Sequence, residues 1–251
     1  MSIQKLVFSF IFLILANYGS LEFIPVFRTK VVLNIDLSSV LPEQVTVETI
    51  DGSNTLHYSI DPIFDEHYKI GEIRNYGVLI SEDSPMAIRR RVSLVANIFG
   101  IIYVQVDNVY CSPYGIFEKH IEELVKEPDD NAYKAVNRTP ITLDIEKLPY
   151  KHPFINEKVE SSGGTRYATH ALLRPYVSIG LIKYGEYVID DRVDDVMNKA
   201  VVVGMNPMGK KMIIITTLAK DATYSTLVYE VVQQENGLPF TLRSYNSVEI
   251  F

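Results

Sequence analysis

The sequence contains no tryptophan and a single cysteine, Cys111. One cysteine excludes an intramolecular disulfide, the covalent link on which small secreted domains commonly depend. Packing can take its place, because 47% of the 251 residues are hydrophobic and a chain of this length can bury a sizeable core. We expect Cys111 to be a small buried apolar side chain, with cross-linking to a partner as the alternative.

The sequence also lacks the residue spacings of common metal and catalytic sites. The histidines are His57, His67, His120, His152 and His170. None forms an H-x-x-x-H pair, and there is no C-x-x-C and no G-x-S-x-G motif. These absences predict no catalytic residue, no cofactor and no metal site. We expect the histidines to lie on strands.

One stretch resembles a phosphate-binding loop. Gly204 to Lys210 reads G-x-x-x-x-G-K, but Lys211 follows where magnesium would need a hydroxyl. The isoleucine-rich residues that come next predict a strand, so no helix N-terminus would face a phosphate. We therefore predict a β-hairpin turn at this position.

Long apolar runs are confined to the N-terminal region. Leu6 to Ala16 is an apolar run of 11 residues that follows Lys5. This pattern is typical of a signal peptide and is too short to span a bilayer. We predict a signal peptide at residues 1–20, cleaved between Ala16 and Ser20, with an uncleaved anchor or a buried N-terminal helix as the alternative. The C-terminal residues lack the apolar tail of a GPI signal, so we expect a secreted mature chain with no stable membrane anchor.

The formal charge of -7 disfavours nucleic acid as a partner. The densest basic cluster, Arg89-Arg90-Arg91, is predicted to be a solvated surface patch. Asn137-Arg138-Thr139 is a glycosylation sequon, although Pro140 weakens the signal.

A segment of the chain occurs twice. The landmarks of the first copy are Ile35-Asp36-Leu37, Tyr58, Ile70-Gly71-Glu72-Ile73, Tyr76-Gly77 and Gly100, and those of the second are Leu143-Asp144-Ile145, Tyr167, Ile179-Gly180-Leu181-Ile182, Tyr184-Gly185 and Gly209. Asp36 and Asp144 are 108 residues apart, and Gly71 and Gly180 are 109 apart. Because the separation is nearly constant across several landmarks, we predict a tandem duplication.

The pattern within each copy is mostly β. Val45 and Val47 alternate with polar residues, as in a half-buried strand, and Asp51-Gly52 marks a turn. We predict a first β module at 21–111 and a second at 139–251. The second is expected to end in an extra hairpin around Asn236-Gly237.

One helix is expected between the copies, within 112–138. Ser112-Pro113 suits a helix start, and Phe117, Ile121, Leu124 and Val125 fall on one helical face. The predicted fold is therefore mainly β, with two homologous antiparallel modules joined by one α-helix.

Asp36 and Asp144 recur at the same landmark, which would also be expected of catalytic acids. We favour a structural function, because a short acid at a strand end can accept hydrogen bonds from backbone amides in a turn.

The order of these landmarks resembles the FAINT domain, a module named for its frequent association with secreted proteins of the piroplasm parasite Theileria. An apolar-Asp-apolar strand comes first, at Asp36 and Asp144. An aromatic follows at Tyr58 and Tyr167, and an Ile-Gly-x-Ile strand then leads to Tyr-Gly. Copies of that family often carry a tryptophan after this strand, which this chain lacks. The resemblance implies export to the parasite surface or the host cell and interaction with host molecules, and it implies no catalytic residues.

We therefore expect a secreted, non-enzymatic protein whose partner is a host or parasite-surface protein. Two alternatives remain. One is a secreted hydrolase with acidic catalytic residues, which requires two carboxyl groups that face each other across a cleft. The other is a carrier of lipids or small ligands, which requires a large apolar cavity between its sheets.

Overall fold

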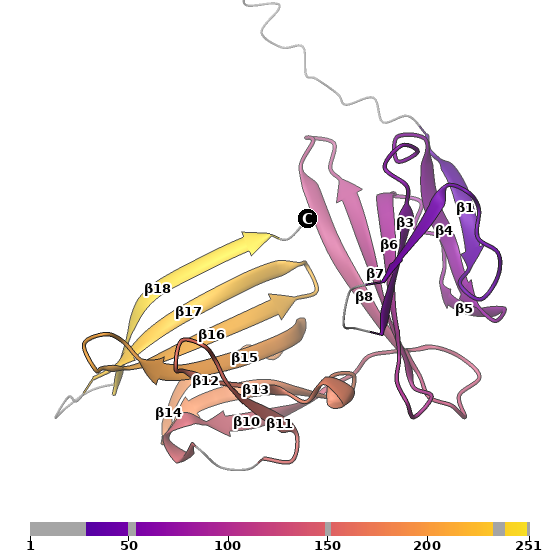
Figure 1. Ribbon diagram of the computed structural model, residues 1–251. Helices are drawn as coiled ribbons and strands as arrows, with labels where there is room; N and C mark the ends of the chain where they lie inside the picture. Colours follow the sequence, from indigo (N-terminus) through magenta and orange to yellow (C-terminus); the bar gives the residue numbers. More distant parts are fainter. Residues whose placement is uncertain (1–28, 50–53, 149–151, 233–238, 250–251) are drawn as a thin grey trace, which may run out of the picture.

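The computed structural model describes residues 29–49, 54–148, 152–232 and 239–249 (Figure 1). These residues are mainly β, as predicted, with two single 3-10 turns, η1 (Ile145–Lys147) and η2 (Ala171–Leu173). The predicted signal peptide and the turns at 51–52 and 236–237 lie outside the described residues. Across the described ranges, no helix has the length and apolar character that a membrane span requires.

The first module has a three-stranded and a six-stranded sheet, with the strand orders β1-β4-β5 and β2-β3-β6-β7-β8-β9. Its strands are β1 (Val31–Asp36), β2 (Val45–Thr49), β3 (Thr55–Ile60), β4 (Tyr68–Asn75), β5 (Val78–Ser81), β6 (Ala87–Ala96), β7 (Ile102–Cys111), β8 (Phe117–Lys126) and β9 (Lys134–Ala135).

The second module repeats this arrangement, with the strand orders β10-β13-β14 and β11-β12-β15-β16-β17-β18. Its strands are β10 (Thr139–Asp144), β11 (Ile155–Val159), β12 (Thr165–Thr169), β13 (Val177–Tyr184), β14 (Tyr187–Asp190), β15 (Val196–Met205), β16 (Lys211–Ala219), β17 (Thr223–Val231) and β18 (Phe240–Glu249). The expectation of two similar β modules is confirmed.

Each module is a sandwich whose core lies between its two sheets. Ile70 and Ile73 on β4 pack with Val92 on β6, and all three are fully buried. In the second module, Ile179 and Ile182 on β13 occupy the corresponding places. Alternate residues of a strand point to opposite faces, so each sheet contributes one row of side chains to the core. Duplication as the origin of this likeness stays a prediction.

The prediction that both modules are antiparallel is wrong for one pair of strands in each module. β1 pairs with β4 in parallel, and β10 pairs with β13 in parallel. Both pairs change register at the same place, between Leu33 and Ile35 and between Ile141 and Leu143. The two strands of such a pair are joined by a crossover rather than a hairpin, and here β2 and β3 form that crossover in the opposite sheet.

The prediction of a helix within 112–138 is wrong. Residues 117–126 form β8, which pairs along its whole length with β7. Leu124 faces the core of its own module, whereas Ile121 packs against the second module. Because both faces of β8 are partly covered, its apolar residues occur on both faces, and their spacing imitates a helical stripe. The first module therefore extends through β9.

The paired strands predicted near the C-terminus are present, because β17 and β18 pair antiparallel. They are not an addition to the repeat, however. β17 follows β16 as β8 follows β7, and β18 takes the place of the two-residue strand β9. What distinguishes the second module is the ten-residue length of β18.

Candidate functional site

Asp36 and Asp144 serve the structural function that the sequence suggested. Asp36 accepts hydrogen bonds from the amides of Tyr76 (3.1 Å) and Gly77 (2.7 Å) in the β4–β5 turn. Asp144 accepts one from the amide of Gly185 (3.0 Å) in the β13–β14 turn. Burial raises the pKa of each carboxyl, but hydrogen bonds outweigh it and hold both pKa values below the ordinary one. Each aspartate ties a hairpin turn to the neighbouring parallel strand.

The loop that resembles a phosphate site is a hairpin turn, as predicted. It joins β15 to β16, and Asn206 closes it by accepting hydrogen bonds from the amides of Met208 and Lys210, both at 2.9 Å. Asn97 closes the β6–β7 turn in the same way. The backbone amides at this turn are thus already used within the hairpin.

The described residues contain no group of three or more His, Cys, Asp or Glu side chains that could hold a metal ion. The expectation that the histidines lie on strands is confirmed for His57 on β3, which contacts Ser93 at 2.9 Å, and for His120 on β8. It is wrong for the other three, which lie in turns or loops: His67, His152 and His170. Cys111 is half-buried at the end of β7. Asn137 is exposed, and its glycosylation stays a prediction.

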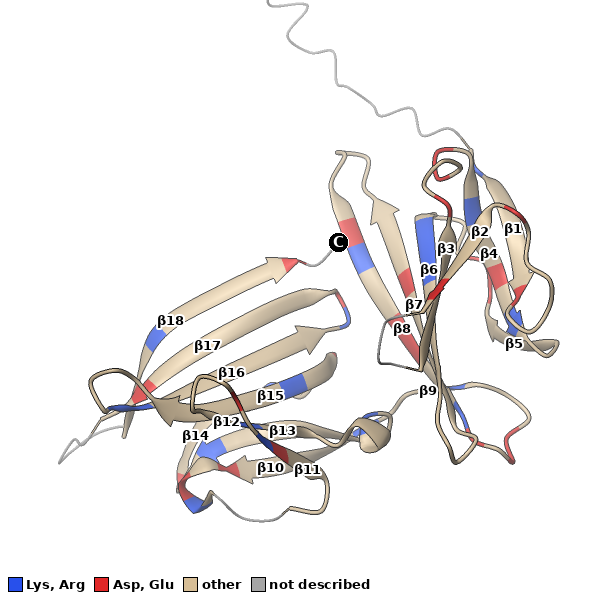
Figure 2. Ribbon diagram, viewed as in Figure 1, with Lys and Arg blue, Asp and Glu red and all other residues tan. Residues whose placement is uncertain are grey.

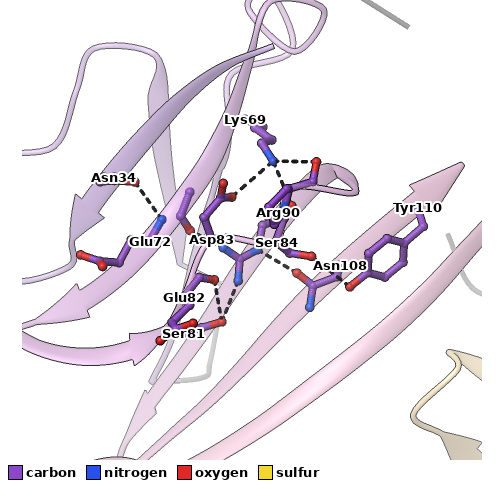
Figure 3. Close-up of polar contacts among 12 residues, drawn as sticks. Asn34, Lys69, Glu72, Ser81, Glu82, Asp83, Ser84, Arg90, Asn108 and Tyr110 are labelled. Carbon is purple, nitrogen blue, oxygen red and sulfur yellow. Dashed lines mark hydrogen bonds and ion pairs between the residues drawn. The ribbon is translucent and has the colours of Figure 1, made fainter. Parts of the chain in front are cut away.

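The prediction of a solvated patch at residues 89–91 is wrong for Arg90, which is 1% exposed. Figure 3 shows its polar contacts. Its guanidinium donates to Asn108 Oδ1 (2.7 Å), to Ser81 Oγ (2.7 Å) and to the carbonyl of Gly71. Successive strand residues point to opposite faces, so of three adjacent arginines the middle one enters the sandwich while Arg91 stays in solvent. Elsewhere, charged residues are spread over the strands and loops of both modules (Figure 2).

The junction between the modules contains a buried ion pair. Arg138, just before β10, forms two hydrogen bonds with Glu123 on β8, Nη1 to Oε2 at 2.7 Å and Nη2 to Oε1 at 2.6 Å. The side chains are 7% and 1% exposed. Arg138 Nε also donates to the carbonyl of Arg174 in the second module (2.6 Å). One guanidinium therefore connects the two modules.

Glu123 has a further partner in Tyr103, whose hydroxyl donates to Oε1. Burial, together with the charge of Glu123, raises the pKa of Tyr103. Burial alone would lower the pKa of Arg138, but its bonds to Glu123 outweigh this effect and raise it. The charges of this cluster are thus matched within it.

A second contact joins the modules at the edge of β8. The amide of Ile121 donates to the carbonyl of Lys220 (2.6 Å), and the Ile121 side chain packs against Met197 and Ala222. The free edge of a strand offers backbone groups that need partners, and here the second module supplies one.

Clefts of differing chemistry lie at this junction, among them a charged one and an apolar one. The first has a volume of about 570 Å³ and is lined by residues that are mostly charged. The lining is His120 from the first module and Asp191, Arg192, Val193, Asp194, Asp195, Lys220 and Asp221 from the second.

The second cleft has a volume of about 470 Å³ and is mostly apolar. The first module contributes the ends of β3, β6 and β7 and the β6–β7 turn, and the second contributes η2 and the residues after it. The lining is Asn54, Thr55, Val95, Ala96, Asn97, Ile98, Ile101, Tyr103, Ala171, Leu172, Arg174 and Pro175. We name it the junction cleft.

The rim of the junction cleft exposes apolar side chains. Ile98 at the β6–β7 turn and Leu172 on η2, which both line the cleft, are 86% and 42% exposed, and Phe99, next to Ile98 in the same turn, is 62% exposed. Apolar residues that gather in this way commonly mark an interaction site. The junction cleft is therefore the strongest candidate for a functional site in the described part of the chain.

No family model, no curated protein and no solved structure matches this chain.

The sequence alone does not reveal the junction cleft. Its lining comes from three separate segments of the chain, which only the packing of the two modules brings together. One signal was available: the apolar pair Ile98-Phe99 directly precedes Gly100, where the chain turns and polar residues are usual.

Proposed function

We propose that this chain is a secreted, non-enzymatic binding protein of the FAINT type, which recognises a host or parasite-surface protein through the junction cleft. The single observation that carries the proposal is the apolar cleft with its exposed rim of Ile98, Phe99 and Leu172. Interfaces are commonly centred on apolar and aromatic anchors of this kind.

Export is the part of this proposal that rests on sequence. The apolar run from Leu6 to Ala16 is typical of a signal peptide. The FAINT assignment likewise rests on the order of landmarks around Asp36 and Asp144 in the two modules.

The structure offers less support for the two alternatives. A hydrolase would use the charged cleft around Asp194 and Asp195, but an acid that donates a proton near neutral pH is usually kept protonated by apolar surroundings, and this cleft is lined mainly by charged groups. A carrier with a cavity between its sheets would need space that side chains such as Ile70 and Val104 fill in the first module.

Capture from host-cell lysate tests the proposal. The mature chain, residues 21–251, is immobilised beside a variant in which Ile98, Phe99 and Leu172 are all replaced by serine. We expect a set of host proteins to bind the wild type in a saturable way and to be lost with the variant. The control replaces Met205 and Met208, which are exposed on the β15–β16 hairpin, by serine and should retain the whole set. Equal capture by the wild type and the rim variant would refute the proposal.

A further inference from the structure

We infer that the junction cleft takes an apolar ligand of small-molecule size that carries one anionic group. This inference goes beyond the proposed function: it shares the assignment of the junction cleft as a recognition site and adds a small-molecule ligand to the protein partner. The size of the cleft, its lining and its charge support it.

Size and lining favour a small apolar ligand. The volume of about 470 Å³ lies within the range of roughly 300–1,000 Å³ that is usual for ligand sites. Val95 and Ile101 line it from the first module, and Leu172 and Pro175 line it from the second. Transfer of apolar surface from water into such a lining is favourable in proportion to the area buried.

Charge favours an anion. Arg174 is the one charged residue among the described residues that line the cleft. Its side chain is exposed and forms no ion pair within the described parts of the chain. Its backbone carbonyl, by contrast, accepts the hydrogen bond from Arg138, which fixes the chain at this point.

The neighbouring acid does not neutralise Arg174. Glu123 accepts a hydrogen bond from the Tyr103 hydroxyl. Both of its carboxylate oxygens are already bonded to Arg138. A guanidinium presents donors in a fork that suits a carboxylate or phosphate. The four aspartates Asp191, Asp194, Asp195 and Asp221 line the other cleft, so their charges are on a different surface from Arg174.

Calorimetric titration of the mature chain with dodecanoate, and separately with dodecanol, tests this inference. The chain has no tryptophan, so heat is a more direct readout than intrinsic fluorescence. We expect saturable binding of dodecanoate at one site. Arg174→Gln should weaken dodecanoate binding about tenfold, the effect of losing one charge-assisted hydrogen bond, and should leave dodecanol binding unchanged. Leu172→Asp should abolish the binding of both.

The matched control is Arg91→Gln, which removes an exposed arginine on β6 that does not line the cleft and should leave both affinities unchanged. Circular dichroism confirms that each variant is folded. Equal dodecanoate affinity in the wild type and Arg174→Gln would overturn the inference, as would the absence of saturable binding to the wild type. If the ligand binds as expected while the rim variant still captures the same host proteins, the protein partner proposed above fails and the ligand class stands.

Discussion

Arg90 on β6 and Lys199 on β15 occupy equivalent positions in the two modules, and each buried cation donates a hydrogen bond to the carbonyl of the equivalent glycine. Arg90 bonds to Gly71, and Lys199 bonds to Gly180 at 2.9 Å. Each side chain is 1% exposed. A cation in this place ties the six-stranded sheet to the three-stranded sheet across the core.

The two cations have different partners because their donors differ. Arg90 spreads its donors over neutral oxygens, including Ser81 Oγ, whereas Lys199 forms an ion pair of 2.6 Å with Asp190, the residue at the position equivalent to Ser81. A compact ammonium concentrates its charge more than a guanidinium does. Burial lowers the pKa of Lys199, and the bond to Asp190 opposes that shift.

Replacement of Lys199 by methionine should destabilise the second module. Asp190, whose side chain is 12% exposed, would lose its cation and keep only the hydrogen bond from the amide of Arg192 (3.3 Å), and loss of one member of a buried pair costs about 3–5 kcal/mol. Urea unfolding measures the change. Arg91→Met, which alters an exposed cation, should shift the free energy of unfolding by no more than about 0.5 kcal/mol. An unchanged midpoint for Lys199→Met would show that the ion pair contributes nothing.

Alanine at Gly71 or Gly180 should destabilise the corresponding module. A Cβ atom at Gly71 would collide with the side chains of Val32 and Asn34, and one at Gly180 would lie 2.6 Å from Pro140 Cβ. Both collisions fall between the parallel strands, where the strands cannot separate without loss of their pairing. We expect a cost of about 1–3 kcal/mol for each, measured by urea unfolding, and none for the exposed control Ser244→Ala on β18. A tolerated alanine at either glycine would contradict this explanation of the repeated Ile-Gly landmark.

Asp36 and Asp144 should make the fold sensitive to acid. Their pKa values are lowered in the folded state, so the unfolded chain takes up protons first as the pH falls. The stability that these groups contribute is complete above the ordinary value of 3.8 and is lost as the pH falls through their folded pKa values.

The measurement is the urea midpoint as a function of pH, from neutral to below 3.8. Asp36→Asn/Asp144→Asn should be less stable than the wild type at neutral pH and should lose less stability on acidification. Asp129→Asn, at an exposed acid outside the β4–β5 and β13–β14 turns, should follow the wild-type curve. A double variant with the same acid dependence as the wild type would exclude this function for the two aspartates.

The sequence predicted the buried landmarks well because burial is periodic. The Ile-Gly-x-Ile pattern places Ile70 and Ile73 in one core and Ile179 and Ile182 in the other. One landmark is displaced, however. The first turn is formed by Tyr76 and Gly77, which lie between the paired residues Asn75 and Val78.

In the second module, Tyr184 pairs with Tyr187, so the turn residues are Gly185 and Glu186. The two Tyr-Gly pairs have the same residue types, but their positions within the equivalent turns differ by one residue. Sequence letters alone could not show this, because a turn is defined by the pairing on both sides of it.

The junction could not be predicted at all. The sequence predicts a helix at β8 because Ser112-Pro113 suits a helix start and because Ile121, Leu124 and Val125 have helical spacing. The strand forms because Leu124 faces its own core while Ile121 faces the second module. Tertiary contacts on both faces decide the outcome, and a single sequence contains no record of those contacts.

Loss of Arg138 should both destabilise the chain and loosen the junction. In Arg138→Met, Glu123 would remain 1% exposed with no cation, at a cost of about 3–5 kcal/mol, and the link to the Arg174 carbonyl would be lost. Lys134→Met is the matched control, because Lys134 pairs with Asp130 at the surface with 66% of its side chain exposed. That pair should contribute about 0–1 kcal/mol.

The double variant Glu123→Leu/Arg138→Met separates the two effects. It leaves no uncompensated charge, so its stability in urea should approach that of the wild type. The modules would still lack their connection, so small-angle X-ray scattering should show a larger radius of gyration than for the wild type and for Lys134→Met. If the double variant keeps the wild-type radius, the contact of Ile121 with the second module is sufficient to hold the junction, and the ion pair is not what fixes the geometry of the cleft.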